Sequence, residues 1–146
     1  MVTFQQTSYG GWATTYTLSN EIVVLIITGD IGPRLIRFGF VDQANIFCEV
    51  PETLGKTGDE TWHIYGGHRF WHAPEDPLRT YYPDNHPVTV EEKDGYIQVT
   101  QPTEPTTGLQ KQLDIYMAED RAYIRVVHRL INQSMWAITG TPWALS

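Results

Sequence analysis

Cysteine is nearly absent from the sequence, since Cys48 is the only one among 146 residues. No disulfide can form within the chain, and the count does not reveal a redox compartment. A chain of this length buries roughly two thirds of its extended surface in a single core. We therefore expect one domain over residues 1–146. Cys48 lies in the apolar stretch NIFCEV, where a thiol behaves as a small hydrophobe rather than as a nucleophile.

Long hydrophobic runs and clustered positive charge are also missing. The longest wholly aliphatic run, residues 22–27, is too short to cross a bilayer, so we expect no membrane span. Residues 1–11 lack the basic and apolar regions of a secretion signal, which favours a cytoplasmic protein unless a leader has been removed. Asp and Glu number 17 against 10 Lys and Arg, a net charge of -7, and the arginines are scattered. Nucleic acid is therefore not an expected partner.

No window of the sequence sustains the 3.6-residue period of an amphipathic helix. β-Branched and aromatic residues instead form short runs between Gly, Pro, Asn and Asp, the pattern of an all-β chain. We expect an antiparallel β-sandwich of about nine strands. In the run 34–40, alternation predicts that Leu35, Arg37 and Gly39 share one face. The expected strands are residues 14–18, 22–28, 34–40, 44–50, 88–92, 96–100, 109–117, 122–132 and one beginning at 135–139.

The strand pattern breaks over residues 51–87, which we expect to be one long irregular loop. It contains GGHRFWHAPE at residues 66–75, rich in Gly and in groups that bind polar ligands. A loop of this length in a compact domain is usually functional, and its many aromatic residues argue against disorder. We expect it to fold over one end of the sandwich, so that its side chains converge on a shared hollow.

Sugar binding suits the composition of this loop. Carbohydrates need flat aromatic faces, with charged or amide groups at the edge of the sugar ring. The opposing interpretation is that Phe70 and Trp71 only fill the end of the sandwich while the charged groups pair with one another; composition alone favours neither. The loop offers the rings of Trp62, Tyr65, Trp71, Tyr81 and Tyr82 and the polar groups of His68, Arg69, His72, Glu75 and Asp76.

A metal site is the alternative function. His68, His72, Glu75 and His128 could together imitate the ligand set of a cupin-like metal-binding protein. The spacing differs from that pattern, because three residues rather than one separate the first two histidines. His128 also stands in phase with the apolar residues of its strand, which favours a core histidine bonded to a neighbour. The sequence has no Gly-x-Ser-x-Gly elbow and no glycine-rich phosphate cradle.

Three stretches resemble the galactose mutarotase-like (aldose 1-epimerase-like) superfamily. They are LSNEIVVLIITGDIGPRLIRFGFVDQANIF at 18–47, YGGHRFWHAPE at 65–75 and KQLDIYMAEDRAYIRVVHRLINQS at 111–134. The likeness covers nearly the whole chain but only the first half of a typical member. It implies the N-terminal half of a β-supersandwich with an open sugar groove.

The resemblance implies a small-molecule sugar as partner and no cofactor. In the superfamily a histidine acid and a glutamate base open and reclose the hemiacetal. The base comes from the later half, which this chain lacks, and no histidine here matches the acid, so the catalytic residues are unknown. Arg69 matches an arginine of the sugar groove and is the first expected substrate-binding residue. The other expected substrate-binding residues are His68, His72, Trp71 and Glu75. Arg34 is expected to have a structural role.

Weak or absent turnover is therefore expected of this chain, as a sugar-binding relative of the epimerases. It is either a truncated piece of a longer supersandwich or a compact domain in its own right. Half a supersandwich leaves apolar sheet surface uncovered, so we also expect a homodimer.

Overall fold

The computed structural model describes all residues from 1 to 146 and contains ten strands and no helix. It therefore has no helix that could cross a membrane. The strands are β1 (Thr3–Tyr9), β2 (Trp12–Ser19), β3 (Val23–Thr28), β4 (Arg34–Phe40), β5 (His68–Ala73), β6 (Thr89–Lys93), β7 (Tyr96–Thr100), β8 (Leu109–Met117), β9 (Ile124–Asn132) and β10 (Thr141–Leu145).

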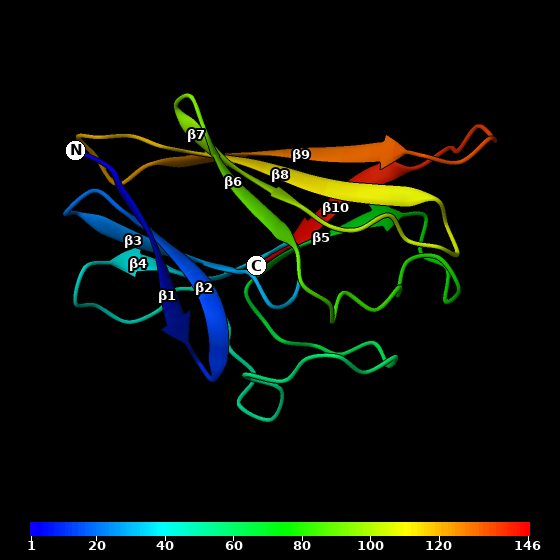
Figure 1. The fold of residues 1–146 in the computed structure, drawn as a ribbon, viewed down its shortest axis with the longest axis horizontal. Helices are drawn as coiled ribbons and strands as arrows, with labels where there is room; N and C mark the ends of the chain where they lie inside the picture. The colour runs from blue at the N-terminus through cyan, green and yellow to red at the C-terminus, as the bar shows by residue number, and fades with distance from the viewer.

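The strands form two antiparallel sheets that face each other, which confirms the predicted all-β sandwich (Figure 1). The six-stranded sheet has the order β1-β2-β3-β4-β5-β10, and the four-stranded sheet has the order β6-β7-β8-β9. The β6–β7 hairpin turns at Asp94 and Gly95, as the Asp-Gly pair predicts, and Gly95 has a φ of 82°.

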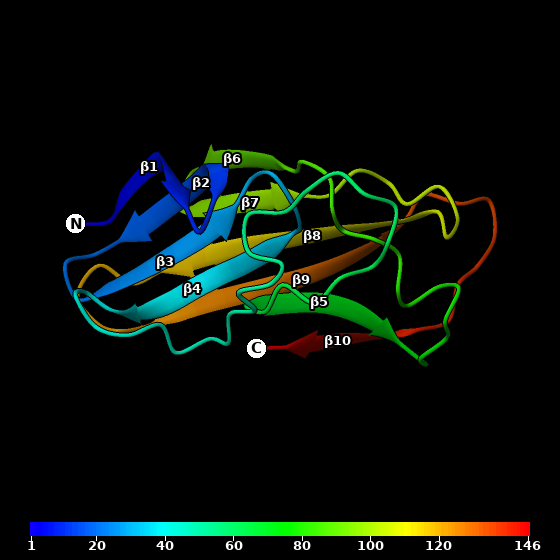
Figure 2. The same cartoon turned by 90° about the horizontal axis from the view of Figure 1, so that it is seen from below.

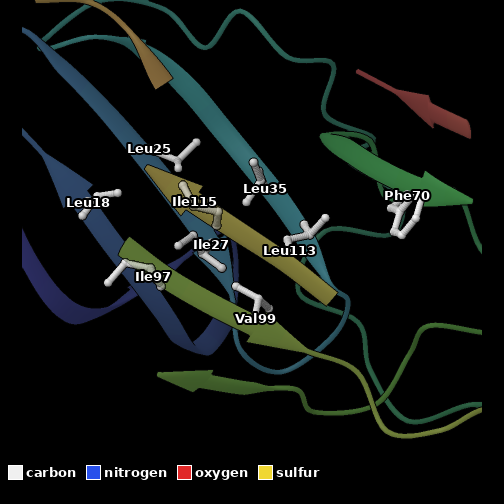
Figure 3. Packing of buried hydrophobic residues seen from close by; sticks show 9 residues of the cluster. All are labelled: Leu18, Leu25, Ile27, Leu35, Phe70, Ile97, Val99, Leu113 and Ile115. Atoms are coloured by element: carbon white, nitrogen blue, oxygen red, sulfur yellow. The ribbon is translucent and has the colours of Figure 1, made fainter. Parts of the chain in front are cut away.

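The main core lies between the two sheets (Figure 3). Leu25 and Ile27 on β3 meet Leu113 and Ile115 on β8, and all four are fully buried. Such alternating inward side chains hold the layers together, because each buried aliphatic side chain contributes roughly 1.5–3 kcal/mol of transfer free energy.

A bulge in β4 changes the expected alternation of residues 34–40. Ile26 pairs with Arg37 while the next residue, Ile27, pairs with Leu35, so Ile36 has no partner of its own. Leu35 and Phe38 consequently both pack on the main core, whereas Ile36 turns to the other face. The extra residue of a bulge shifts every later side chain to the opposite face.

The outer face of the six-stranded sheet carries a second apolar cluster. The connection from residue 41 to residue 67 crosses this face (Figure 2) and supplies Tyr65 and Leu54 to the cluster. Trp12 is fully buried there and donates its indole N–H to the carbonyl of Lys56 at 3.0 Å. The first part of the predicted loop thus covers a sheet face rather than an end of the sandwich.

Two expected strands are absent. Residues 44–50 make only one isolated bridge, Glu49 to Gly66. The Asn45 side chain instead accepts from the N–H of Phe38 and donates to the carbonyl of Ile36, so a side chain replaces a strand beside β4. Residues 135–139 are likewise not a strand, because residues 134–136 form a bend held by the Asn132 and Ser134 side chains, and strand pairing begins only at β10.

Candidate functional site

The prediction of a fully irregular segment at 51–87 is wrong for residues 68–73, which form β5. This strand pairs with β4 on one side and with β10 on the other. Two glycines precede it with positive φ, 85° at Gly66 and 69° at Gly67. A Cβ at Gly66 would lie 2.2 Å from the carbonyl oxygen of Cys48, so glycine is required for this close backbone approach.

The alternation of β5 separates the predicted site residues into two groups. Phe70 lies in the main core, and His68 on the same face meets His128 from the opposite sheet. Arg69 is paired in register with Arg34, and both reach Asp84. The expected shared hollow does not form, because Arg69 and Trp71 face outward from the sandwich while His68 and His72 face its interior.

Arg34, Arg69 and Asp84 form a buried ion cluster at the start of β5. The Asp84 carboxylate accepts from Arg34 Nη2 at 2.7 Å and from Arg69 Nη2 at 3.4 Å. Burial alone would raise the pKa of Asp84, but the two guanidinium groups hold it below its ordinary value. Burial lowers the pKa of Arg69 to about 10, with Asp84 acting in the opposite direction. Two cations therefore share one carboxylate.

Arg34 has the structural role expected of it. Its Nη1 donates to the carbonyl of Gly66 at 2.5 Å, and its guanidinium lies 5.2 Å from the centre of the Tyr65 ring. It thereby ties the connection that precedes β5 to the beginning of β4.

Aromatic rings surround the outward-facing guanidinium of Arg69. Its central carbon lies 4.9 Å from the ring centre of Trp62 and 4.5 Å from that of Trp71, and the two indoles meet at 57°. The Tyr81 ring is 4.9 Å from Trp62 and 5.7 Å from Trp71. We call Arg69, Trp62, Trp71 and Tyr81 the Arg69 cage. Trp143 on β10 adds an edge-on ring 4.9 Å from Trp71, a contact that the sequence did not predict.

Three hydrogen-bond donors of the cage have no acceptor. They are Arg69 Nη1, Trp62 Nε1 and Trp71 Nε1, and each is shielded from solvent. Buried polar atoms are rarely left without a partner, and such atoms in a native protein call for an explanation by water, an ion or a ligand. All three are N–H groups, so the missing partner is an acceptor.

Glu75 lies at the exposed rim of this cage. Its carboxylate accepts a hydrogen bond from the Tyr81 hydroxyl, and both residues belong to the connection between β5 and β6. That bond raises the pKa of the Tyr81 hydroxyl, with burial as the next cause.

The inward-facing histidines take part in different contacts. His68 and His128 approach at 2.8 Å between their Nε2 atoms, so one must donate and the other accept. Burial, followed by the charge of His128, lowers the pKa of His68 to about 4. Burial also lowers the pKa of His128. His128 is thus a half-buried histidine bonded to a neighbour on the inner face, as its phase in the strand predicts.

His72 lies further along the interior, where its side chain meets a buried ion pair. Lys111 and Glu104 approach at 2.6 Å with almost no exposure. Burial and then the charge of Lys111 lower the pKa of His72, whose Nδ1 has no partner. No three side chains of the metal-binding types gather where they could hold an ion. The four residues of the cupin-like alternative therefore do not form one group, and that alternative stays a prediction without support from this arrangement.

A small surface hollow of about 30 Å³ is lined by Asp84 and Tyr82, and two larger hollows lie away from the cage. One of about 360 Å³ is bounded by the β1–β2 turn and residues 55–58, and another of about 170 Å³ lies between β1 and β7. Neither is lined by Arg69, Trp71 or Glu75. Three donor atoms of the Arg69 cage are shielded from solvent, so a ligand can reach them only if a side chain moves.

Comparison of the chain with models of protein families, with curated proteins and with solved structures finds no match in any of the three.

Proposed function

We propose that this chain binds a monosaccharide on the outer face of its six-stranded sheet, at the Arg69 cage. The observation that carries the proposal is a buried guanidinium between two indoles on which Tyr81 also packs, with three N–H donors that lack acceptors. A sugar supplies what is missing, because its C–H faces stack on indole and phenol rings and its oxygens accept from N–H groups.

Three of the predicted substrate-binding residues belong to this proposal. Arg69 donates hydrogen bonds, Trp71 offers a ring face, and Glu75 accepts from a hydroxyl at the rim. His68 and His72 lie on the inner face of β5 and have no part in it. Trp62, Tyr81 and Trp143 join the site instead.

The relation to galactose mutarotase-like proteins is part of the same proposal. Its support is the sequence likeness and the position of Arg69 beside partly buried aromatic rings. The cage contains no histidine, and its nearest carboxylates are engaged, Asp84 by two arginines and Glu75 by Tyr81. Because an acid and a base each contribute about 100-fold to 10,000-fold to such a reaction, we propose binding with weak or absent epimerase activity.

Calorimetric titration with a panel of monosaccharides tests this function. The wild-type chain should bind at least one aldose, and Trp71→Ala should lose most of that affinity because it removes a wall of the cage. Arg125→Ala is the matched control, since Arg125 stacks on Tyr116 on β8, away from the cage. A panel without any binding would reject the proposal, and polarimetry with fresh glucose and galactose measures turnover.

A further inference from the structure

Resting on the function proposed above, we infer that the ligand is an acidic monosaccharide of the uronic acid class. Its carboxylate pairs with Arg69, while its ring stacks on the indoles of the cage.

The first argument is the charge balance of the buried cluster. Arg34 and Arg69 carry two positive charges, and Asp84 carries the one negative charge that contacts them. The next charged groups inward, Glu104 and Lys111, neutralise each other in their own ion pair. One buried positive charge thus has no counterion, and a buried charge is costly unless it is paired. A ligand with one negative charge removes this cost.

The second argument is the number and kind of the unused donors. Asp84 occupies Nη2 of Arg69, while Nη1 lacks an acceptor in a side chain that is only 6% exposed. The indole N–H groups of Trp62 and Trp71 are the other buried donors of the cage without an acceptor. A carboxylate has two oxygens with about four acceptor positions, enough for all three N–H groups. Charge-assisted bonds of this kind are about twice as strong as neutral ones.

The same balance distinguishes a carboxylate from a phosphate ester. A phosphate monoester carries about −1.5 to −2 at neutral pH, more than the single uncompensated charge of the cluster. Lys111, whose charge acts on Asp84, is already paired with Glu104, and the fold has no helix N-terminus to neutralise the remainder. We therefore expect a uronate to bind more tightly than a hexose phosphate.

Entry to the cage requires a side chain to move, because the Nη1 atom of Arg69 is shielded from solvent, and we infer that Tyr81, which packs on both indoles, is the one that moves. The Tyr81 hydroxyl is held only by Glu75 on the same connection. Tyr81→Phe keeps the ring but removes this bond, and should therefore raise affinity for the acidic sugar. Glu75→Gln should raise it further, since it also removes a negative charge beside the entering carboxylate while its amide oxygen still accepts from the sugar hydroxyl.

Calorimetry with four ligand types tests the inference at low salt: D-galacturonate, its neutral methyl ester, D-galactose and glucose 6-phosphate. We expect D-galacturonate to bind at least about tenfold more tightly than the other three, as one added charge-assisted pair provides. Arg69→Lys should reduce this preference several-fold, because lysine keeps the charge but loses the planar fork. The ester comparison uses the unchanged protein, so it decides the question even if variants at Arg69 fold poorly.

Each outcome of this calorimetry decides between the acidic-sugar inference and the proposed function. Equal or tighter binding of D-galactose or of the methyl ester overturns the acidic-sugar inference and leaves the proposed function standing. Preference for glucose 6-phosphate also overturns it, because the single-charge argument then fails. No binding by any of the four, nor by D-glucuronate and D-glucose, overturns both and leaves buried water as the partner of the three donors.

Discussion

Asp84 is the residue on which the buried charges depend. It is the only carboxylate that contacts both Arg34 and Arg69, and its side chain is 4% exposed. Asp84→Asn keeps the shape of the side chain but leaves both guanidinium groups without an anion. We expect a loss of about 3–5 kcal/mol in the free energy of unfolding, as for other broken buried ion pairs. Urea denaturation measures it.

The control for this change is Asp114→Asn on β8. Asp114 is also buried, but its partner Arg129 is half exposed, so water can solvate the arginine left behind. A smaller loss in the free energy of unfolding is expected there. Equal losses in the two variants would contradict this account of Asp84.

The wild-type chain should also lose stability as pH falls below about 4. The lowered pKa of folded Asp84 favours folding only while the unfolded carboxyl, with a pKa of about 3.9, is ionised.

The pair of His68 and His128 predicts a second pH dependence. His68 has a pKa of about 4 in the folded chain against an ordinary value of 6.5, so the unfolded chain takes up the proton first as pH falls. The contribution of His68 to the free energy of unfolding is therefore fully present above pH 6.5 and is lost as pH falls to about 4. For a partly exposed group we expect about 1–2 kcal/mol over this range.

His68→Leu should remove most of that decline, as thermal unfolding at several pH values would show. His86→Gln serves as control, because the His86 side chain is 44% exposed on a loop. A variant of His68 that keeps the full decline between pH 6.5 and 4 would assign the effect to other groups.

Single residues show what the sequence could predict of the site. His128 follows the phase of its strand, so its place on the inner face was predictable. His68 and His72 stand beside Arg69 and Trp71 in the sequence, and without a strand assignment nothing separates the two pairs. Trp143 reaches the cage by pairing of β10 with β5, a contact across 72 residues of which no local pattern gives a sign.

At the scale of elements, the most consequential error of the sequence interpretation was to predict an irregular segment where β5 lies. Its burial pattern shows why: Arg69 and His72 are as deeply buried as Phe70, so apolar and polar residues do not alternate. Glycines before it and Pro74 after it add signals typical of a loop. By contrast, β3, β7 and β8 have mainly aliphatic inner faces. The predicted bounds of these three strands differ from the observed ones by at most one residue.

The two faces of β5 can be distinguished by paired substitutions. Phe70→Ala empties a fully buried position in the main core and should cost about 3–5 kcal/mol of stability. Trp71→Ala, on the outer face and partly exposed, should cost clearly less stability while removing most of the ligand affinity. Denaturation and calorimetry on both variants test the assignment. A larger stability loss for Trp71→Ala would mean that the face assignment is inverted.

At the scale of the whole molecule, the sandwich is closed less tightly along one side. Leu113 and Ile115 on β8 are fully buried, whereas Val126 and Leu130 on the neighbouring edge strand β9 are only partly so. Figure 2 shows β9 and β10, the edge strands of the two sheets, along the same side. The connection between them exposes Met135 and Trp136, whose exposed fractions are 89% and 76%, together with Ile138. Exposed apolar groups concentrated in one region are typical of protein interfaces.

We therefore expect a second copy of the chain to cover this side, giving a homodimer in sedimentation equilibrium. A double variant, Met135→Ser with Trp136→Ser, should shift the equilibrium to monomer, because a few large side chains supply much of the binding energy of an interface and these two lie on the connection between the edge strands. Its thermal midpoint measured at the lowest protein concentration should stay unchanged, since neither side chain packs on the core. Phe40→Ser, an exposed position at the far end of β4, is the matched control and should leave the dimer intact. A wild-type chain that sediments as a monomer at high micromolar concentration would show that this apolar side is not covered by a second copy.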